Sequence, residues 1–423
     1  MDRMDRSVVV TGIGMVTPIG TGKAAFAQNL HAGRSGIGPI TAFDTGRLAS
    51  HLGAEAVDFD PKDFVSIKNR RRMDRLSQMA TASARMALED AGLAVTPANR
   101  DRVGMIMGTA FGSTDVAARF VGALFTEGPH RVNPILVPNT VMNAPAGHAA
   151  IELGFRGLNT TVNHREASAE TAIAYAAAEI RQGRADAILA GGADLFSAFF
   201  MEIVSHFKAL SPLDDGVEAA RPYDRRRNGA ILGEGAGLLC LESREQALAR
   251  GAAPYCEIAG WGLSAAPAPP TDWPVDTRGP VLAMERALAM AGAGPRDIDI
   301  VSGSANGGRG LDRLEADALA AVFAHSHGAP WITSLKGALG ESFSSGGIRS
   351  AAMALSLKDG IVPPTLGLER PLAPLRFARD APKRVPLGWG LVNGLASGGT
   401  FAALLMKRTN DTPKVRETSD ASR

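Results

Sequence analysis

The chain has 423 residues, 45% of them hydrophobic, which is enough for one large layered α/β unit or for two to three ordinary domains. Its 45 Lys and Arg against 43 Asp and Glu leave a formal net charge of +2, so charge gives no reason to expect binding to nucleic acid or to an anionic membrane. No apolar run is long enough for a membrane span, and residues 1–6 lack a hydrophobic signal core, so we expect a cytoplasmic protein.

The two cysteines, Cys240 and Cys256, lie in apolar, strand-like runs. They form no CxxC motif and no Cys/His cluster, so the sequence predicts neither a disulfide framework nor a metal site. We expect both thiols to pack in the core.

The first elements in chain order are a buried strand over 7–18, a helix over 74–93 that ends near Gly92, and a short strand over 103–109. The turn after the first strand contains Gly12 and Gly14, but Thr17 stands where a dinucleotide-binding fingerprint has its third glycine. The sequence therefore argues against a nicotinamide or flavin dinucleotide site.

A second helix is predicted over 111–127, with an apolar face formed by Val116, Phe120, Leu124 and Phe125. The segment 133–140 that follows is predicted to be a loop, because Pro134 and Pro138 interrupt regular structure. Another helix is expected over 144–153.

The segment 158–194 predicts a strand over 159–162, a sharp turn, a helix over 167–180 and a strand that ends at Asp194. Glu166 lies in the turn, where the helix N-terminus offers unpaired N–H groups and a positive dipole end. Many enzymes place a nucleophile at such a junction. The local pattern leaves open whether Glu166 is a first-turn helix residue or a functional group.

The segment 221–242 is a charged, Gly-rich loop that leads into a buried strand. Its run Arg225-Arg226-Arg227 is predicted to be a solvated or ion-paired loop, because no aromatic residues interleave it as in a nucleic-acid patch. An irregular connection is expected over 264–280, where Pro and Ala are dense.

The second half repeats the alternation of the first. Helices are predicted over 279–291, 311–323 and 345–358, and strands over 298–304, 330–334, 387–400 and 401–406. This pattern predicts an α/β fold with helices on both faces of mostly parallel or mixed sheets. We expect an N-terminal half over 1–255, a similar C-terminal half over 256–408, and a disordered tail over 409–423.

Over nearly its whole length the chain resembles the β-ketoacyl-acyl carrier protein synthases of the thiolase-fold superfamily. The motifs that carry the resemblance occur in the expected order at 8–20, 185–194, 221–224 with 232–237, and Asn393 with 397–400. The resemblance implies two similar halves in a layered αβαβα arrangement.

The resemblance also implies a catalytic Cys at the strand-to-helix turn and two later His residues, and this chain departs at all three positions. They correspond to Glu166, Asn306 and Glu341, whereas Lys336 and Glu315 keep the family's identities. A carboxylate cannot form the thioester of the condensation, and no imidazole pair is left to stabilise the enolate. We therefore expect no ketosynthase activity from the chain alone.

This pattern of loss is similar to the chain length factors, or ketosynthase beta subunits, of type II polyketide synthases. The resemblance implies a non-catalytic subunit that forms a heterodimer with a Cys-bearing ketosynthase and shapes the acyl tunnel to set polyketide chain length. The implied substrate is an acyl chain on the phosphopantetheine of a partner acyl carrier protein, with no cofactor bound by this chain. Tunnel or interface residues are expected between 111 and 142, namely Phe111, Phe120, Leu124, Phe125, Val137 and Met142.

Two alternatives belong to other classes. Glu166 and Glu341 could act as a carboxylate pair in a malonyl-carrier decarboxylase or another acid/base enzyme. The chain could also be a homodimeric acyl-binding protein. Lys336, Arg165 and Arg309 are all candidates to neutralise the two carboxylates.

Overall fold

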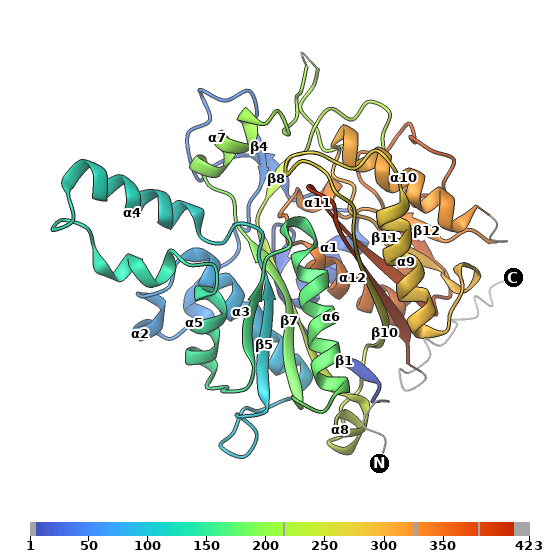
Figure 1. Cartoon of the computed structure of the whole chain (residues 1–423), viewed down its shortest axis with the longest axis horizontal. Coiled ribbons are helices and arrows are strands. Elements are labelled where there is room, and N and C mark those ends of the chain that lie inside the picture. Colours follow the sequence, from blue (N-terminus) through green and yellow to red (C-terminus); the bar gives the residue numbers. More distant parts are fainter. Residues whose placement is uncertain (1–5, 215, 325–327, 380, 410–423) are drawn as a thin grey trace, which may run out of the picture.

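The computed structural model describes residues 6–214, 216–324, 328–379 and 381–409, and its dominant feature is a mixed β-sheet (Figure 1). Ten strands pair in the order β12-β11-β15-β16-β10-β1-β9-β7-β5-β6, and β2 pairs with β1. The strands of this sheet are β1 (Val8–Thr17), β2 (Gly20–Thr21), β5 (Val103–Gly108), β6 (Asn159–Val162), β7 (Ala187–Asp194), β9 (Gly235–Ser243), β10 (Cys256–Ala265), β11 (Ile300–Ser302), β12 (Trp331–Thr333), β15 (Trp389–Ala396) and β16 (Thr400–Arg408).

Smaller sheets and the helices complete the described chain. The short strands are β3 (Ile37–Pro39), β4 (Leu52–Ala54), β8 (Leu232–Gly233), β13 (Ile361–Val362) and β14 (Lys383–Arg384). The helices are α1 (Lys23–His31), α2 (Ile67–Arg70), α3 (Arg75–Ala91), α4 (Thr114–Glu127), α5 (Ala144–Leu153), α6 (Ser168–Arg181), α7 (Ala198–His206), α8 (Arg244–Ala249), α9 (Arg278–Ala291), α10 (Arg309–Phe323), α11 (Lys336–Leu339) and α12 (Gly346–Asp359). Short 3₁₀ turns are η1 (Pro61–Asp63), η2 (Pro134–Asn139), η3 (Arg165–Ala167) and η4 (Pro295–Asp297).

The main sheet consists of two series of five strands with the same pairing pattern. In the series β1-β9-β7-β5-β6 the first two pairs are antiparallel and the last two are parallel. The series β10-β16-β15-β11-β12 repeats this pattern strand for strand. A short antiparallel contact between β1 and β10 joins the two series. The prediction of an α/β fold with two similar halves is therefore confirmed.

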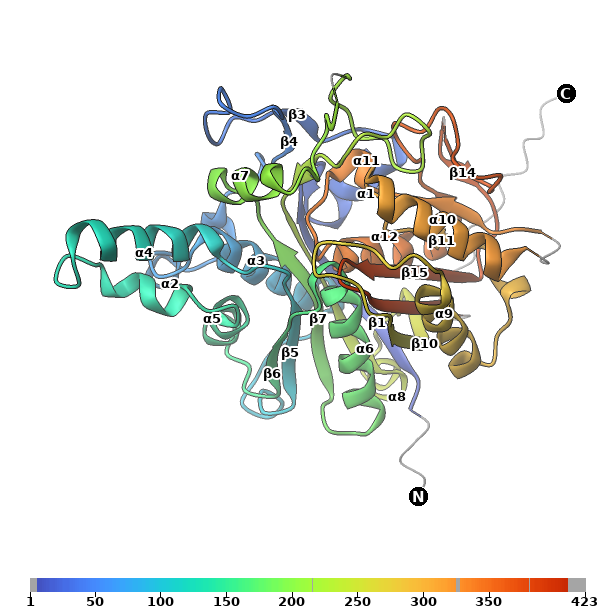
Figure 2. The ribbon, with the colours of Figure 1, turned by 45° about the horizontal axis from the view of Figure 1, so that its top comes forward.

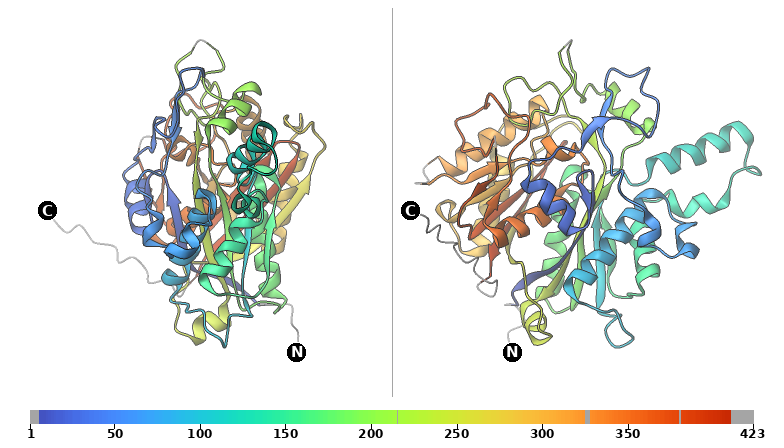
Figure 3. Two further views of the ribbon diagram at one scale, coloured as in Figure 1. Left: turned by 90° about the vertical axis from the view of Figure 1, so that its left-hand side faces the viewer. Right: turned by 180° about the vertical axis from the view of Figure 1, so that it is seen from behind.

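The helices form three layers around the two series of strands (Figure 3). Helices α3 and α5 cover the outer face of the first series, and α9 and α10 cover the outer face of the second. Helices α6 and α12 contact each other and strands of both series, so they form the middle layer. Because both faces of the strands are covered, β1, β5, β7 and β9 are buried along their whole length.

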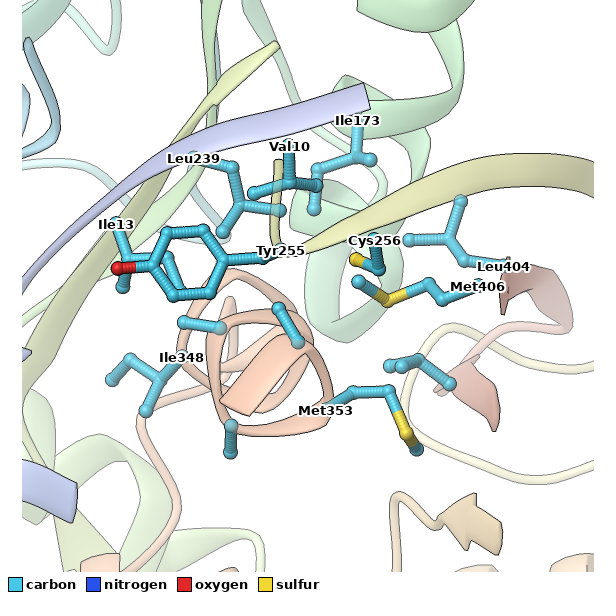
Figure 4. Packing of buried hydrophobic residues seen from close by; sticks show 14 of the residues in the cluster. Val10, Ile13, Ile173, Leu239, Tyr255, Cys256, Ile348, Met353, Leu404 and Met406 are labelled. Atoms are coloured by element: carbon cyan, nitrogen blue, oxygen red, sulfur yellow. The ribbon is translucent and has the colours of Figure 1, made fainter. Parts of the chain in front are cut away.

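The core of the middle layer lies where α12 packs beneath β1, β9 and β10 (Figure 4). Val10 and Leu239 of the first series lie in one cluster with Cys256 and Met406 of the second and with Ile348 of α12, and all five are at most 2% exposed. At about 25 cal/mol per Å² of apolar surface, burial of this kind is the main stabilising contribution to the fold. Both cysteines lie in this and the adjoining core, as predicted.

Most elements fall where the sequence predicts them. The helix predicted over 74–93 is α3, which begins after Asp74, whose carboxylate accepts a hydrogen bond from the Ser77 N–H (3.1 Å). It ends at Gly92, which adopts a left-handed conformation with φ of 61°. The prediction of a loop over 133–140 is wrong at 134–139, because Pro134 opens a 3₁₀ turn and Asn133 caps it.

Helix α4 and turn η2 form an arm that projects from the layered body (Figures 1 and 2). This arm, residues 114–142, carries several large apolar side chains that are 44% to 82% exposed: Val121, Phe125, Ile135, Val137, Val141 and Met142. Such a concentration of exposed apolar residues is typical of a surface that another chain covers.

Two further predictions concern the C-terminal tail and membrane-spanning helices. The predicted tail over 409–423 lies, except for Thr409, outside the described residues. Within the described ranges, none of the helices has the length and apolar character needed to cross a bilayer.

Candidate active site

A cavity of 350 Å³ lies between the N-terminal end of α6, helix α7 and the loops that follow β11 and β15. Much of its wall is apolar, formed by Phe111, Phe200, Ile203, Val204, Phe207, Leu210, Leu213, Leu232 and Phe343. The rings of Phe111, Phe200 and Phe343 pack together, with centroids 4.6 to 5.3 Å apart. Polar lining is provided by Arg165, Glu166, Asn306, Arg309, Glu341 and Ser397, among others. An apolar wall with a few convergent polar groups is typical of a small-molecule site.

Glu166 lies at the strand-to-helix junction that the sequence predicts, in η3 between β6 and α6. The preceding residue, Arg165, has a φ of 50°, a left-handed conformation that is uncommon for a residue other than glycine. Glu166 is only 8% exposed, and its carboxyl accepts hydrogen bonds from the Ser397 N–H (3.1 Å) and the Ser397 hydroxyl (3.1 Å). The turn therefore aims a buried carboxyl into the cavity.

Burial raises the pKa of Glu166 above its ordinary value, and the charge of nearby Glu341 adds to the rise. The Arg165 guanidinium lies 4.0 Å from the carboxylate and acts in the opposite direction. Arg165 also donates a hydrogen bond to the Pro270 carbonyl. Glu166 is consequently protonated up to a higher pH than an exposed glutamate.

Glu341 and Asn306 form a second polar group in the cavity. One oxygen of Glu341 accepts hydrogen bonds from the Lys336 ammonium (2.7 Å) and the Asn306 amide (2.7 Å), and the other accepts one from the Phe343 N–H (2.8 Å). Lys336 and Glu341 are both 2% exposed. The Asn306 amide nitrogen carries a second hydrogen, so it can donate to a ligand in the cavity while it holds Glu341.

Two carboxylates of α10 fix the loop that carries Asn306. Glu315 accepts hydrogen bonds from the N–H groups of Ser304 and Ala305 and from the Tyr223 hydroxyl, each at 2.6 to 2.8 Å. Asp312 accepts from the Asn306 N–H at 3.0 Å and from the Tyr223 N–H at 2.7 Å. Burial raises the pKa of Asp312 to about 7. These contacts fix the backbone from which the Asn306 side chain extends.

The structure brings together Glu166, Asn306 and Glu341, which the sequence singles out at widely separated positions. Of the three candidates to neutralise the carboxylates, Lys336 pairs with Glu341 and Arg165 lies nearest Glu166. Arg309 pairs instead with Asp214 at 2.8 Å.

Glu315 does not line the cavity, but holds the neighbouring loop from outside. The sequence reasoning did not identify the roles of Ser397 and Asp312. Ser397 lies in the motif 397–400 that carries the resemblance, but that motif does not indicate its contact with Glu166.

Of the six predicted tunnel or interface residues, Phe111 lines this cavity. The other five, Phe120, Leu124, Phe125, Val137 and Met142, lie on the projecting arm or at its base and do not line it. Their predicted contact with the tunnel of a partner subunit involves a second chain and stays a prediction.

Neither cysteine can serve as a nucleophile here. Cys240 and Cys256 lie in β9 and β10 and do not line the cavity. Burial raises the pKa of Cys240 to about 12, so its thiol stays protonated near neutral pH. Within the described part of the chain, no group of three or more His, Cys, Asp or Glu side chains is arranged to hold a metal ion.

Two family models match most of the chain. Residues 5–247 match the family described as Beta-ketoacyl synthase, N-terminal domain, and residues 255–369 match Beta-ketoacyl synthase, C-terminal domain. A 3-oxoacyl-[acyl-carrier-protein] synthase 2 of Coxiella burnetii is 32% identical over 411 residues, which cover 96% of this chain and 99% of the relative.

Two solved structures share the fold over 96% of this chain. The ishigamide ketosynthase/chain length factor has a TM-score of 0.88 with 31% identity and 99% of its chain covered. A type II polyketide synthase ketosynthase, AntDE, in complex with its acyl-carrier protein and bound to the hexaketide, has a TM-score of 0.85 with 25% identity and its full chain covered.

These comparisons correct two expectations from the sequence. The interpretation as a non-catalytic chain length factor is wrong, as is the expectation that the lone chain is not an enzyme, because relatives that span 95% or more of the chain are named as enzymes. The same names favour a condensing enzyme over a lone acid/base enzyme and over an acyl-binding protein. Loss of the thiol and the imidazoles is not loss of every functional group, because the cavity is still lined by the buried carboxyls of Glu166 and Glu341 and by the Asn306 amide.

Proposed function

Because the chain belongs to the β-ketoacyl synthase family, we propose that it is a condensing enzyme that acts on acyl chains carried by the phosphopantetheine arm of an acyl carrier protein. The reaction joins a malonyl-derived two-carbon unit to an acyl group, with loss of carbon dioxide. The observation that carries the proposal is the cavity in which an apolar wall meets the buried carboxyl of Glu166.

The apolar wall suits an acyl chain, and the polar lining suits a thioester. Side chains from α7 and the Phe111, Phe200 and Phe343 rings offer a dry surface for methylene groups, each worth about 0.8 kcal/mol when buried. The free hydrogen of the Asn306 amide can donate to the thioester oxygen as negative charge develops there. The Lys336 ammonium balances the charge of the Glu341 carboxylate that holds Asn306 in place.

Glu166 takes the position from which the acyl group would be transferred. A carboxylate can act as a nucleophile toward an acyl thioester. Its oxygen would attack the thioester carbonyl, the pantetheine thiolate would leave, and an acyl anhydride would form on Glu166. The enolate left by decarboxylation of the malonyl thioester would then attack the anhydride carbonyl, form the new carbon–carbon bond and release the Glu166 carboxylate.

Only the ionised form of Glu166 can react in this way. Since burial raises the pKa of Glu166, we expect the rate to rise with pH through a midpoint above that of an ordinary glutamate. The hydrogen bonds from Ser397 and the Arg165 guanidinium stabilise the carboxylate that this step needs.

The test is to incubate the purified chain with an acyl-carrier-protein thioester and malonyl-carrier protein, and to measure the 3-oxoacyl product by mass spectrometry. Hydroxylamine added in a parallel reaction converts an acyl anhydride on Glu166 to a hydroxamate, which peptide mapping locates. Glu166→Gln, which keeps the shape of the side chain, should abolish both signals. Glu285→Gln, at an exposed position of α9, is the matched control and should retain them. Product formation that survives Glu166→Gln would refute the role of Glu166, and no product from the unaltered chain would refute the proposed function.

We further propose that the arm at 114–142 docks a second subunit of ketosynthase fold, with a Cys-bearing ketosynthase as the partner. The exposed apolar side chains of the arm, among them Phe125 at 82% exposure, support this proposal. Co-expression with a Cys-bearing ketosynthase, followed by native mass spectrometry, tests it. Phe125→Asp should prevent copurification, whereas Val57→Asp, at an exposed apolar position outside the arm, should not. Copurification that is insensitive to Phe125→Asp, or a chain that is always a monomer, would contradict the proposal.

A further inference from the structure

A recess of 550 Å³ next to the cavity is lined by five arginines. These are Arg221, Arg225, Arg226, Arg227 and Arg309, together with Asp214, Gly216 and Asn228. Four of the arginines come from the loop that precedes β8, and Arg309 comes from the first turn of α10. The run 225–227 therefore does not simply extend into solvent, but lines a concave surface.

The positive charge of the recess is only partly compensated. Arg226 pairs with Asp224 (3.1 Å) and Glu369 (2.9 Å), and Arg309 pairs with Asp214. The hydrogen bonds found for the other three arginines, among the residues that the structure describes, go to backbone carbonyls: Arg221 to Val217 and Arg226, Arg225 to Pro371, and Arg227 to Asp224 and Arg309. A carbonyl orients a guanidinium without cancelling its charge.

Arg227 is held in the recess by two backbone carbonyls. Its two terminal nitrogens donate to the carbonyls of Asp224 (3.3 Å) and Arg309 (3.1 Å). Its Nε is buried and has no hydrogen-bond partner among the described residues. Burial lowers the pKa of Arg227, and the charges of Arg309 and Arg313 act in the same direction, whereas the charges of Asp312 and Asp224 oppose them. An anion in the recess would offset this repulsion.

Arg309 links the recess to the cavity, because it lines both. A ligand whose thioester end lies near Glu166 and Asn306 can therefore extend past Arg309 into the arginine recess. Guanidinium groups match the oxygens of phosphate in bidentate geometry, which makes a phosphate ester the best fit to several converging arginines.

We propose that this recess is a phosphate site that binds the phosphate of a phosphopantetheine arm while the thioester end occupies the cavity. The identity of the arm rests on the proposed function. The phosphate site itself rests only on the arginines and can equally bind free phosphate. Loss of one charge-assisted contact should weaken binding of the phosphorylated ligand by about 10- to 100-fold.

The experiment measures binding by isothermal titration calorimetry with three probes: inorganic phosphate, a non-hydrolysable acyl-pantetheine amide, and the same amide with its phosphate. The proteins are the unaltered chain, Arg227→Gln, Arg225→Gln and the control Arg313→Gln. Arg313 carries the same charge on α10, pairs with Asp317 and does not line the recess. Urea unfolding midpoints verify that the variants fold. If Arg227→Gln does not fold, the comparison rests on Arg225→Gln, because Arg225 is exposed and its replacement should not disturb the fold.

We expect the unaltered chain and Arg313→Gln to prefer the phosphorylated amide, and Arg227→Gln and Arg225→Gln to lose that preference. If the unaltered chain binds inorganic phosphate, Arg227→Gln does not, and the unaltered chain binds both amides equally, the result would support the phosphate site with free phosphate as its ligand. The proposal is overturned if neither the binding of inorganic phosphate nor the preference for the phosphorylated amide depends on Arg225 and Arg227. Condensation assayed with the pantetheine thioester lacking phosphate reports on the proposed function separately, because it does not require the recess.

Discussion

Replacing Lys336 by Met should destabilise the chain severely, because it leaves the Glu341 carboxylate buried without a counter-charge. In the folded chain both side chains are 2% exposed and the ammonium lies 2.7 Å from the carboxylate. Removing one member of a buried ion pair typically costs about 3–5 kcal/mol of unfolding free energy. The remaining hydrogen bonds from Asn306 and the Phe343 N–H do not supply a charge. We therefore expect a loss of about 3 kcal/mol or more.

Equilibrium unfolding in urea, followed by circular dichroism, measures this loss. The double variant Lys336→Met/Glu341→Gln removes both charges and should recover at least half of it, since the buried carboxylate is gone. Arg313→Met breaks an exposed pair with Asp317 on α10 and should cost less than about 1 kcal/mol. A loss from Lys336→Met no larger than that from Arg313→Met would refute the view that Lys336 holds the charge of Glu341 in the site.

Three further outcomes are expected. The folded chain keeps a proton on Asp312 up to about pH 7, whereas the unfolded chain releases it near pH 3.8, so the unfolding free energy should fall by up to about 4 kcal/mol as pH rises between these values. Urea titrations at several pH values should show a smaller dependence of the unfolding free energy on pH in Asp312→Asn. An unchanged dependence would contradict the raised pKa of Asp312. Ser397→Ala removes a hydrogen bond to the Glu166 carboxylate, so the pH at which the condensation rate reaches half its maximum should rise by about one unit. An unchanged midpoint in the pH–rate profile would show that Glu166 does not control the rate. A Cβ at Gly108 would lie 2.4 Å from the carbonyl carbon of Ser168, so Gly108→Ala should cost at least about 1–3 kcal/mol in urea unfolding, and a neutral effect would mean that β5 and α6 can separate.

The sequence located most helices and long strands because their signals are local. Helix α5 and strand β6 fall where the periodicity and flanking glycines place them. It missed α1, whose Phe26 and Leu30 pack in the central core, and α7, whose apolar residues pack against side chains of distant loops. It also missed the short strands β3 and β4, for which the pairings found in the described chain are with each other and with β8. An element stabilised mainly by distant partners leaves a weak local pattern.

By itself, the sequence determined the α/β alternation and the presence of a carboxyl at the start of α6, because helix caps and strand periodicity involve neighbours in the chain. Only the tertiary structure decided what that carboxyl meets. Ser397, the donor to Glu166, is 231 residues away in sequence, and Glu341 meets Asn306 across 35 residues. The arginine recess likewise joins the loop before β8 to α10. Contacts of this kind depend on how the layers pack, which no local pattern encodes.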